Sequence, residues 1–91
     1  MIKTQTGSTT RIKGITRFIV QSSPIGTIFK ARSLSLKVQS VIGEKDLQYF
    51  YECYNSRPQR SKGETTIEWE MKDLELSGVV CRIAPRTWSV N

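Results

Sequence analysis

The 91-residue sequence contains no histidine, and its first 43 residues contain no aspartate or glutamate. Without histidine, the chain lacks the commonest general base of enzymes and one of the usual ligands of structural zinc. Its two cysteines, Cys53 and Cys81, lack the paired spacing of a zinc site. We therefore expect no metal, no cofactor, and two buried, reduced thiols that pack as small apolar groups.

Long apolar runs are also missing. No segment approaches the roughly 20 apolar residues that span a bilayer, and the polar residues 1–10 lack the apolar segment of a signal peptide. We expect a cytoplasmic protein with no membrane partner. The sequence contains no G-x-S-x-G, P-loop or G-x-G-x-x-G motif, so these patterns predict a non-enzymatic protein.

Positive charge is concentrated in the N-terminal half of the chain. The formal net charge is +6, and all eight acidic residues lie between Glu44 and Glu75. Such asymmetry predicts a surface that attracts a polyanion or an acidic protein.

The length fits one domain with a small core, and we expect a flexible arm over residues 1–10 followed by a single α+β domain over residues 11–91. Residues 11–21 alternate between apolar and basic side chains, which predicts a strand. Pro24 and Gly26 suit a turn. Residues 27–39 predict the return strand, with a β-bulge at Arg32 and Ser33, where the apolar alternation slips by one residue.

The second half predicts one helix and two further strands. Residues 43–56 carry an apolar stripe of Leu47, Phe50, Tyr51 and Tyr54 at helical spacing, and this helix should end near Asn55. A polar basic loop should cover residues 57–63. Strands are predicted over residues 65–72 and 79–84, the first with a second phase shift at its end. The expected fold is ββαββ, an antiparallel sheet of about four strands with one helix on a face.

The basic outer face of the predicted N-terminal hairpin, joined by the basic loop, is the main candidate site. Alternate residues on a strand lie about 6.8 Å apart, a spacing that lets a row of cations contact successive phosphates. The candidate nucleic-acid-binding residues are Arg11, Lys13, Arg17, Lys30, Arg32, Lys37, Arg57, Arg60 and Lys62. The alternative is that these cations form ordinary cross-strand ion pairs with Glu68 and Glu70, and that the loop is a solvated connector.

Aromatic residues offer weaker evidence of a site. In the predicted helix, Phe50, Tyr51 and Tyr54 lie on the core stripe, which leaves Tyr49 pointing outward, and one exposed tyrosine makes no stacking platform. Trp69 and Trp88 are expected in the core, although tryptophan is also enriched in interface hot spots.

Three functions remain open from the sequence. The first is a binding module for RNA, DNA or a nucleoprotein complex. The second is a protein–protein inhibitor of the kind that phages and other mobile elements use against host complexes, including CRISPR defence complexes. The third is a homodimer formed by pairing of the exposed edge strands of two sheets. In that case the basic residues of the first strand would serve to protect an open sheet edge, and no ligand would be needed to explain them.

Overall fold

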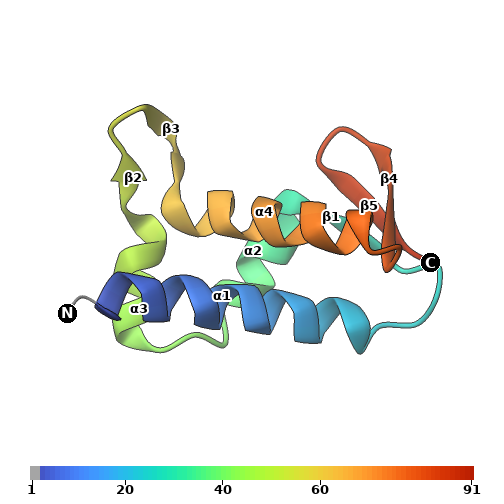
Figure 1. Cartoon of the computed structure of the whole chain (residues 1–91), viewed down its shortest axis with the longest axis horizontal. Helices are drawn as coiled ribbons and strands as arrows, with labels where there is room; N and C mark the ends of the chain where they lie inside the picture. Colours follow the sequence, from blue (N-terminus) through green and yellow to red (C-terminus); the bar gives the residue numbers. More distant parts are fainter. Residues whose placement is uncertain (1–2) are drawn as a thin grey trace.

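The structure of the protein, a computed structural model, describes residues 3–91 apart from the side chains of residues 3–6 and 57. Within that range the chain forms four helices, a three-stranded antiparallel sheet and a two-stranded sheet (Figure 1). The helices are α1 (Lys3–Gln21), α2 (Ala31–Gln39), α3 (Glu44–Tyr51) and α4 (Lys62–Leu76). The strands are β1 (Ile28–Lys30), β2 (Cys53–Tyr54), β3 (Arg57–Ser61), β4 (Val80–Ala84) and β5 (Thr87–Val90).

Helices α1 and α4 lie alongside each other, and the two β-hairpins project beyond opposite ends of α4 (Figure 1). On α1, Ile12, Thr16 and Val20 repeat every fourth residue and are fully buried. On α4, Ile67 and Met71 follow the same spacing and are also buried. This four-residue repeat places the apolar side chains of each helix on one face, which packs into the common core.

The start of α4 is specified by local sequence. The Ser61 side chain accepts a hydrogen bond from the Glu64 backbone N–H, and the Glu64 carboxylate accepts one from the Ser61 backbone N–H. This capping box satisfies two backbone donors at the helix end. Gly63 follows directly in the first turn, where its lack of a side chain lets the backbone lie against the ring of Phe50 on α3.

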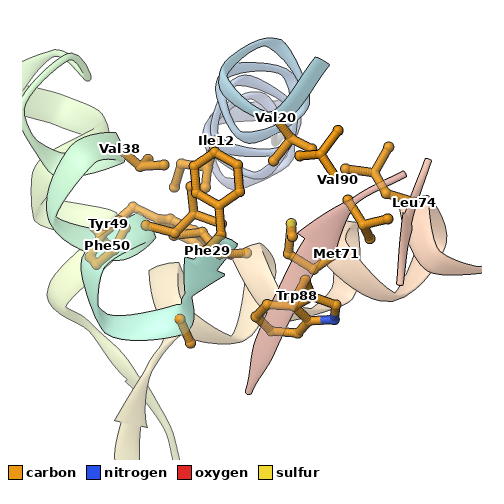
Figure 2. Packing of buried hydrophobic residues seen from close by; sticks show 14 residues of the cluster. Ile12, Val20, Phe29, Val38, Tyr49, Phe50, Met71, Leu74, Trp88 and Val90 are labelled. Atoms are coloured by element: carbon orange, nitrogen blue, oxygen red, sulfur yellow. The ribbon is translucent and has the colours of Figure 1, made fainter. Parts of the chain in front are cut away.

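The three-stranded sheet has the order β1-β5-β4. Phe29 of β1 pairs with Trp88 of β5, and both side chains are buried on the sheet face that meets the helices. Figure 2 shows Phe29, Trp88 and Val90 packed with the buried side chains of the helices. The neighbouring residues Ile28 and Lys30 are exposed, because successive side chains of a strand point to opposite faces.

The expected ββαββ arrangement is wrong, although the α+β class is confirmed. Residues 11–21 belong to α1, residues 31–39 to α2 and residues 65–72 to α4, so none of them is a strand. The N-terminal basic hairpin therefore does not exist. Residues 3–10, expected as an arm, form the first turns of α1, whereas residues 1–2 lie outside the described part of the chain.

Both phase shifts that predicted irregular strands are three-residue steps of helices. In α2 the buried positions include Ala31, Leu34 and Val38, and in α4 they include Met71 and Leu74. A step of three residues changes an apolar run from odd to even positions, but on a helix it keeps the side chains on one face. No β-bulge forms at Arg32 and Ser33, because these residues are helical.

The predicted helix over residues 43–56 exists as α3 but ends at Tyr51 instead of near Asn55. Part of its expected orientation is wrong. Phe50 is buried as expected, but Tyr49 is buried and Tyr51 is exposed. The basic loop over residues 57–63 is instead strand β3 and the start of α4.

The C-terminal expectations are largely confirmed. The strand over residues 79–84 is β4, and Trp88 and Val90 pack the end of the chain into the core. The expectation that Trp69 lies in the core is wrong, because this residue is 45% exposed. The burial expected for Cys53 and Cys81 is also wrong, because both free thiols are exposed.

Candidate functional site

A groove of about 360 Å³ lies between α4 and the β4–β5 hairpin. Its apolar lining comes from Trp69 and Leu76 on α4 and from Pro85 and Trp88 on the hairpin. Its charged lining comes from the cations Lys72, Arg82 and Arg86 and from the carboxylates of Glu68 and Glu75, which leaves an excess of one positive charge. The groove therefore combines aromatic surface with positive charge.

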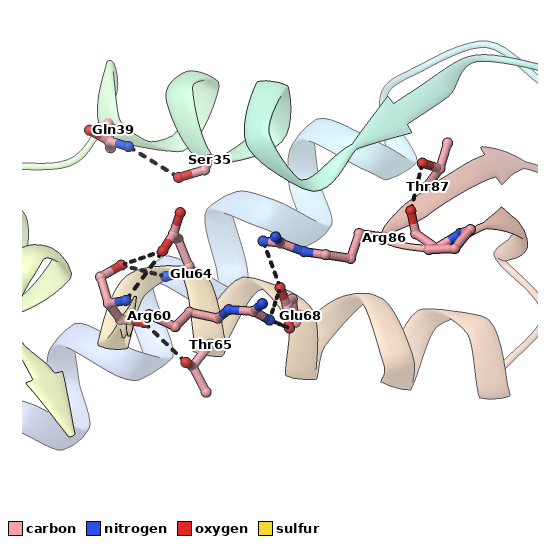
Figure 3. Close-up of polar contacts among 10 residues, drawn as sticks. Ser35, Gln39, Arg60, Glu64, Thr65, Glu68, Arg86 and Thr87 are labelled. Atoms are coloured by element: carbon pink, nitrogen blue, oxygen red, sulfur yellow. Dashed lines mark hydrogen bonds and ion pairs between the residues drawn. The ribbon is translucent and has the colours of Figure 1, made fainter. Parts of the chain in front are cut away.

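Glu68 organises one side of this groove. Its carboxylate accepts two hydrogen bonds from Nη1 of Arg60 at 2.8 and 2.9 Å, and it pairs with Nη2 of Arg86 at 2.9 Å. Figure 3 shows these two guanidinium groups converging on Glu68. Since two arginines share one carboxylate, the cluster keeps a net positive charge.

The hairpin tip is held next to the start of α2. The backbone N–H of Ala31 donates to the carbonyl oxygen of Arg86 at 2.9 Å, and Lys30 pairs with Thr87 across the sheet. Lys30 and Arg32 flank Ala31 in sequence and are exposed. Lys30, paired with Thr87, and Arg82, paired with Trp88, point to opposite faces of the sheet. We use the name cationic face for the cations that line the groove or lie on the elements bordering it: Lys30, Arg32, Arg60, Lys72, Arg82 and Arg86.

Arg86 occupies an unusual backbone conformation at the hairpin tip. Its φ is 55°, the only positive value for a non-glycine residue among the described residues. Pro85 precedes it, and a turn of this kind favours glycine at the position with positive φ. An arginine here costs backbone energy, so the side chain must contribute something that a glycine would not.

Arg11, predicted to contact phosphate, is instead bound to a carboxylate of α3. Its Nε and Nη2 lie 2.6 and 2.7 Å from the two carboxylate oxygens of Asp46, which also accepts a hydrogen bond from Ser8 Oγ at 2.7 Å. The Arg11 guanidinium, helped by Ser8, holds the pKa of the buried Asp46 carboxyl below its usual value against the opposing effect of burial. This pair fastens α1 to α3.

The lowered pKa of Asp46 predicts a pH-dependent contribution to stability. A carboxyl group whose pKa is lower in the folded state stabilises the fold above its unfolded pKa, and this stabilisation disappears as the pH falls through the folded pKa. Asp46→Asn should lower the melting midpoint by about 5–10 °C at pH 7. The melting midpoints of the two proteins, compared from about pH 7 to 2, should begin to approach each other as the pH falls below about 4 and should meet only below the folded-state pKa of Asp46. A difference that does not change with pH would contradict this role of Asp46.

Two other predicted phosphate-binding cations also bind carboxylates within the protein. Nε of Arg17 lies 2.7 Å from Oε2 of Glu70. Glu70 was expected on an outer face of a strand, but its side chain is fully buried. Nζ of Lys62 lies 3.0 Å from Glu52, and above the ring of Tyr54 at 5.2 Å from its centre. Burial, together with a hydrogen bond to Tyr49, raises the pKa of Tyr54 to about 12. These contacts attach β2 and β3 to the helices.

The structure thus divides the nine predicted site residues. Lys30, Arg32 and Arg60 belong to the cationic face. Lys13 and Lys37 lie elsewhere, on α1 and α2, and the side chain of Arg57 is outside the described part. The ion-pair alternative holds for Arg17 with Glu70 and Arg60 with Glu68, although as contacts of helices instead of strands.

Sequence reasoning missed Lys72, Arg82, Arg86 and the exposed Trp69. Two signals point to these residues. The Pro85-Arg86 pair between two short alternating runs indicates a tight turn with a cation at its tip. The Ser-x-x-Glu sequence of residues 61–64 marks a helix start, and a helix from that point turns Trp69 away from the buried Ile67 and Met71.

Two searches of the described residues bear on other site types. No group of three or more histidine, cysteine or acidic side chains within residues 3–91 is arranged to hold a metal ion. Over the same range, none of the helices has the length and apolar character needed to cross a membrane. No protein-family model, curated protein or solved structure matches this chain.

Proposed function

We propose that the protein is a non-enzymatic nucleic-acid-binding domain that uses the cationic face. The observation that carries this proposal is that the β4–β5 hairpin and the elements bordering its groove carry six cations against two groove carboxylates, those of Glu68 and Glu75, with Glu68 already shared by two arginines. Phosphate groups suit such a surface, because arginine binds them in a bidentate manner and lysine binds them as a point charge.

The shapes of the elements support the same function. An α-helix and a two-stranded β-ribbon are the two kinds of element that fit into the major groove of DNA, and here α4 lies beside the β4–β5 hairpin (Figure 1). Because architecture alone does not establish function, the proposal depends mainly on the charges.

Phosphate contacts are expected to come mostly from the hairpin and from the start of α2. Helix α4 also exposes Asp73 and Glu75, and both repel phosphates, Glu75 from within the lining of the groove. Lys30 and Arg82 form no ion pair within the described residues. Their charges are therefore available to a ligand without breaking an internal contact.

Charge reversal tests this proposal. In a fluorescence anisotropy titration with a labelled 20-bp DNA duplex, the double variant Lys30→Glu/Arg82→Glu should bind at least about tenfold more weakly than the unmodified protein. The slope of log affinity against log salt concentration should fall by about 2, since two phosphate contacts are lost.

The matched control is Lys13→Glu/Lys37→Glu. It changes the net charge by the same amount, and both lysines lack an ion pair within the described residues. This variant should lose only the smaller, long-range part of the attraction and keep its salt slope. Equal losses in the two variants would show that binding follows net charge alone and would remove the cationic face from the account.

A further inference from the structure

The groove between α4 and the hairpin contains two tryptophans with different roles. Trp69 is 45% exposed and offers part of its ring to solvent. Trp88 is 5% exposed, and its indole Nε1–H has no hydrogen-bond acceptor among the described residues. Both residues line the groove.

An unpaired buried donor is costly. Most buried polar groups in folded proteins have a partner, and leaving one without an acceptor forfeits the hydrogen bonds that it makes with water. The indole nitrogen only donates, so the missing partner must supply an oxygen or an unprotonated nitrogen. A ligand atom that fills this role recovers the lost interaction.

The other groups that line the groove narrow the chemistry of such a ligand. The three cations of the lining, Lys72, Arg82 and Arg86, outnumber its two carboxylates and therefore favour an anion. Trp69, Leu76 and Pro85 provide apolar surface for a flat group. A nucleotide carries both features, because its phosphate is anionic and its base is planar and bears carbonyl oxygens. Aromatic side chains hold unpaired bases by stacking, and nearby cations hold the backbone.

We propose that this groove holds one unpaired nucleotide of a single-stranded nucleic acid. This inference rests on the proposed function and adds to it a contact with an unpaired nucleotide, separate from the phosphate contacts made with a duplex. The base stacks on Trp69, the phosphate contacts Lys72 and Arg82, and an oxygen of the nucleotide accepts a hydrogen bond from Trp88 Nε1. The N–H of Trp88 is covered in this structure, so binding displaces one of the long side chains at the groove rim.

An unpaired base suits the groove better than a base in a duplex. Inside a duplex both faces of each base are covered by neighbouring bases, so no face is free to stack on Trp69. The groove is also small, with a volume of about 360 Å³. A single extruded or unpaired nucleotide is therefore the expected occupant.

The test uses the two tryptophans as their own reporters, since the chain contains no others. A single-stranded dT12 oligonucleotide should quench the tryptophan fluorescence, whereas a 12-bp duplex should leave it nearly unchanged. Trp69→Leu should weaken dT12 binding by roughly tenfold or more. Trp88→Phe keeps an aromatic ring in the core but removes the donor, and should weaken binding several-fold. A parallel titration with rU12 shows whether the sugar matters.

The control is Tyr51→Leu, which removes another exposed aromatic ring, on α3, and should leave dT12 binding unchanged. Unchanged fluorescence with dT12, or a Trp69→Leu variant that binds dT12 normally, would overturn the inference. Duplex binding, measured separately by fluorescence anisotropy of the labelled 12-bp duplex, would then leave the proposed function intact. If neither the single strand nor the duplex binds, both the inference and the proposed function fail.

Discussion

Gly63→Ala is expected to destabilise the protein by at least about 2–3 kcal/mol, which corresponds to a drop of roughly 10–20 °C in the melting midpoint. Glycine to alanine within a helix normally stabilises it by about 0.5–1 kcal/mol. Here an ideal Cβ would overlap the ring of Phe50, which is 1% exposed and cannot move aside without disturbing the core. Thermal unfolding followed by circular dichroism measures the effect.

Gly14→Ala is the matched control. An ideal Cβ at Gly14 on α1 meets no atom within 4 Å, so this variant should melt at the same temperature or slightly above the unmodified protein. A second check is Gly63→Ala combined with Phe50→Leu. The smaller side chain makes room for the new Cβ, so the double variant should lose less stability than the sum of the single variants. Normal stability of Gly63→Ala would show that α3 does not pack on α4 as described.

Arg17→Leu is expected to cause the second large loss of stability. Glu70 is fully buried, and its Oε2 is bound to Arg17 while its Oε1 has no hydrogen-bond partner among the described residues. Without Arg17 the carboxylate is a buried charge with no counterion, which is strongly unfavourable. We expect a fall of the melting midpoint on the order of 10 °C at pH 7.

A double variant distinguishes a buried charge without a counterion from the loss of packing contacts of the Arg17 side chain. Replacing both partners, as Arg17→Leu/Glu70→Leu, should restore most of the stability. A double variant that is less stable than Arg17→Leu would indicate that Glu70 stabilises the fold through contacts other than this ion pair.

The α+β class, strand β4 and helix α3 were predictable from the sequence, because local patterns determine them. The run over residues 79–84 alternates and ends at Pro85, and the stripe over residues 47–51 has helical spacing, so both elements were located approximately. These segments contain enough periodic residues within one element to identify its type.

The three remaining helices were not predictable in the same way. On α1, Ile12, Thr16 and Val20 are four residues apart, and a spacing of four satisfies both the two-residue period of a strand and the turn of a helix. Glycine and threonine within α1 also lower its intrinsic helix propensity. Whether this segment forms a helix or a strand therefore depends on contacts with distant segments, such as that of Arg17 with Glu70.

The candidate site shows the same limit. The acid-free N-terminal half predicted a cationic surface for a polyanion or an acidic protein, and two of its cations, Lys30 and Arg32, are exposed. It also suggested Arg11 and Arg17, whose partners Asp46 and Glu70 come from helices far along the chain. Which cations remain available depends on tertiary packing, and so does the meeting of α4 with the hairpin that forms the groove.

The most direct test of the account is the affinity of the unmodified protein for labelled DNA and RNA, single-stranded and duplex, measured by anisotropy at about 50 and 200 mM salt. We predict binding that weakens by roughly 100-fold across this range for about four phosphate contacts. Binding that is insensitive to salt, or absent at 50 mM salt, would contradict a nucleic-acid-binding function. If the protein then bound a protein complex but no free nucleic acid, this result would favour the hypothesis of a protein–protein inhibitor.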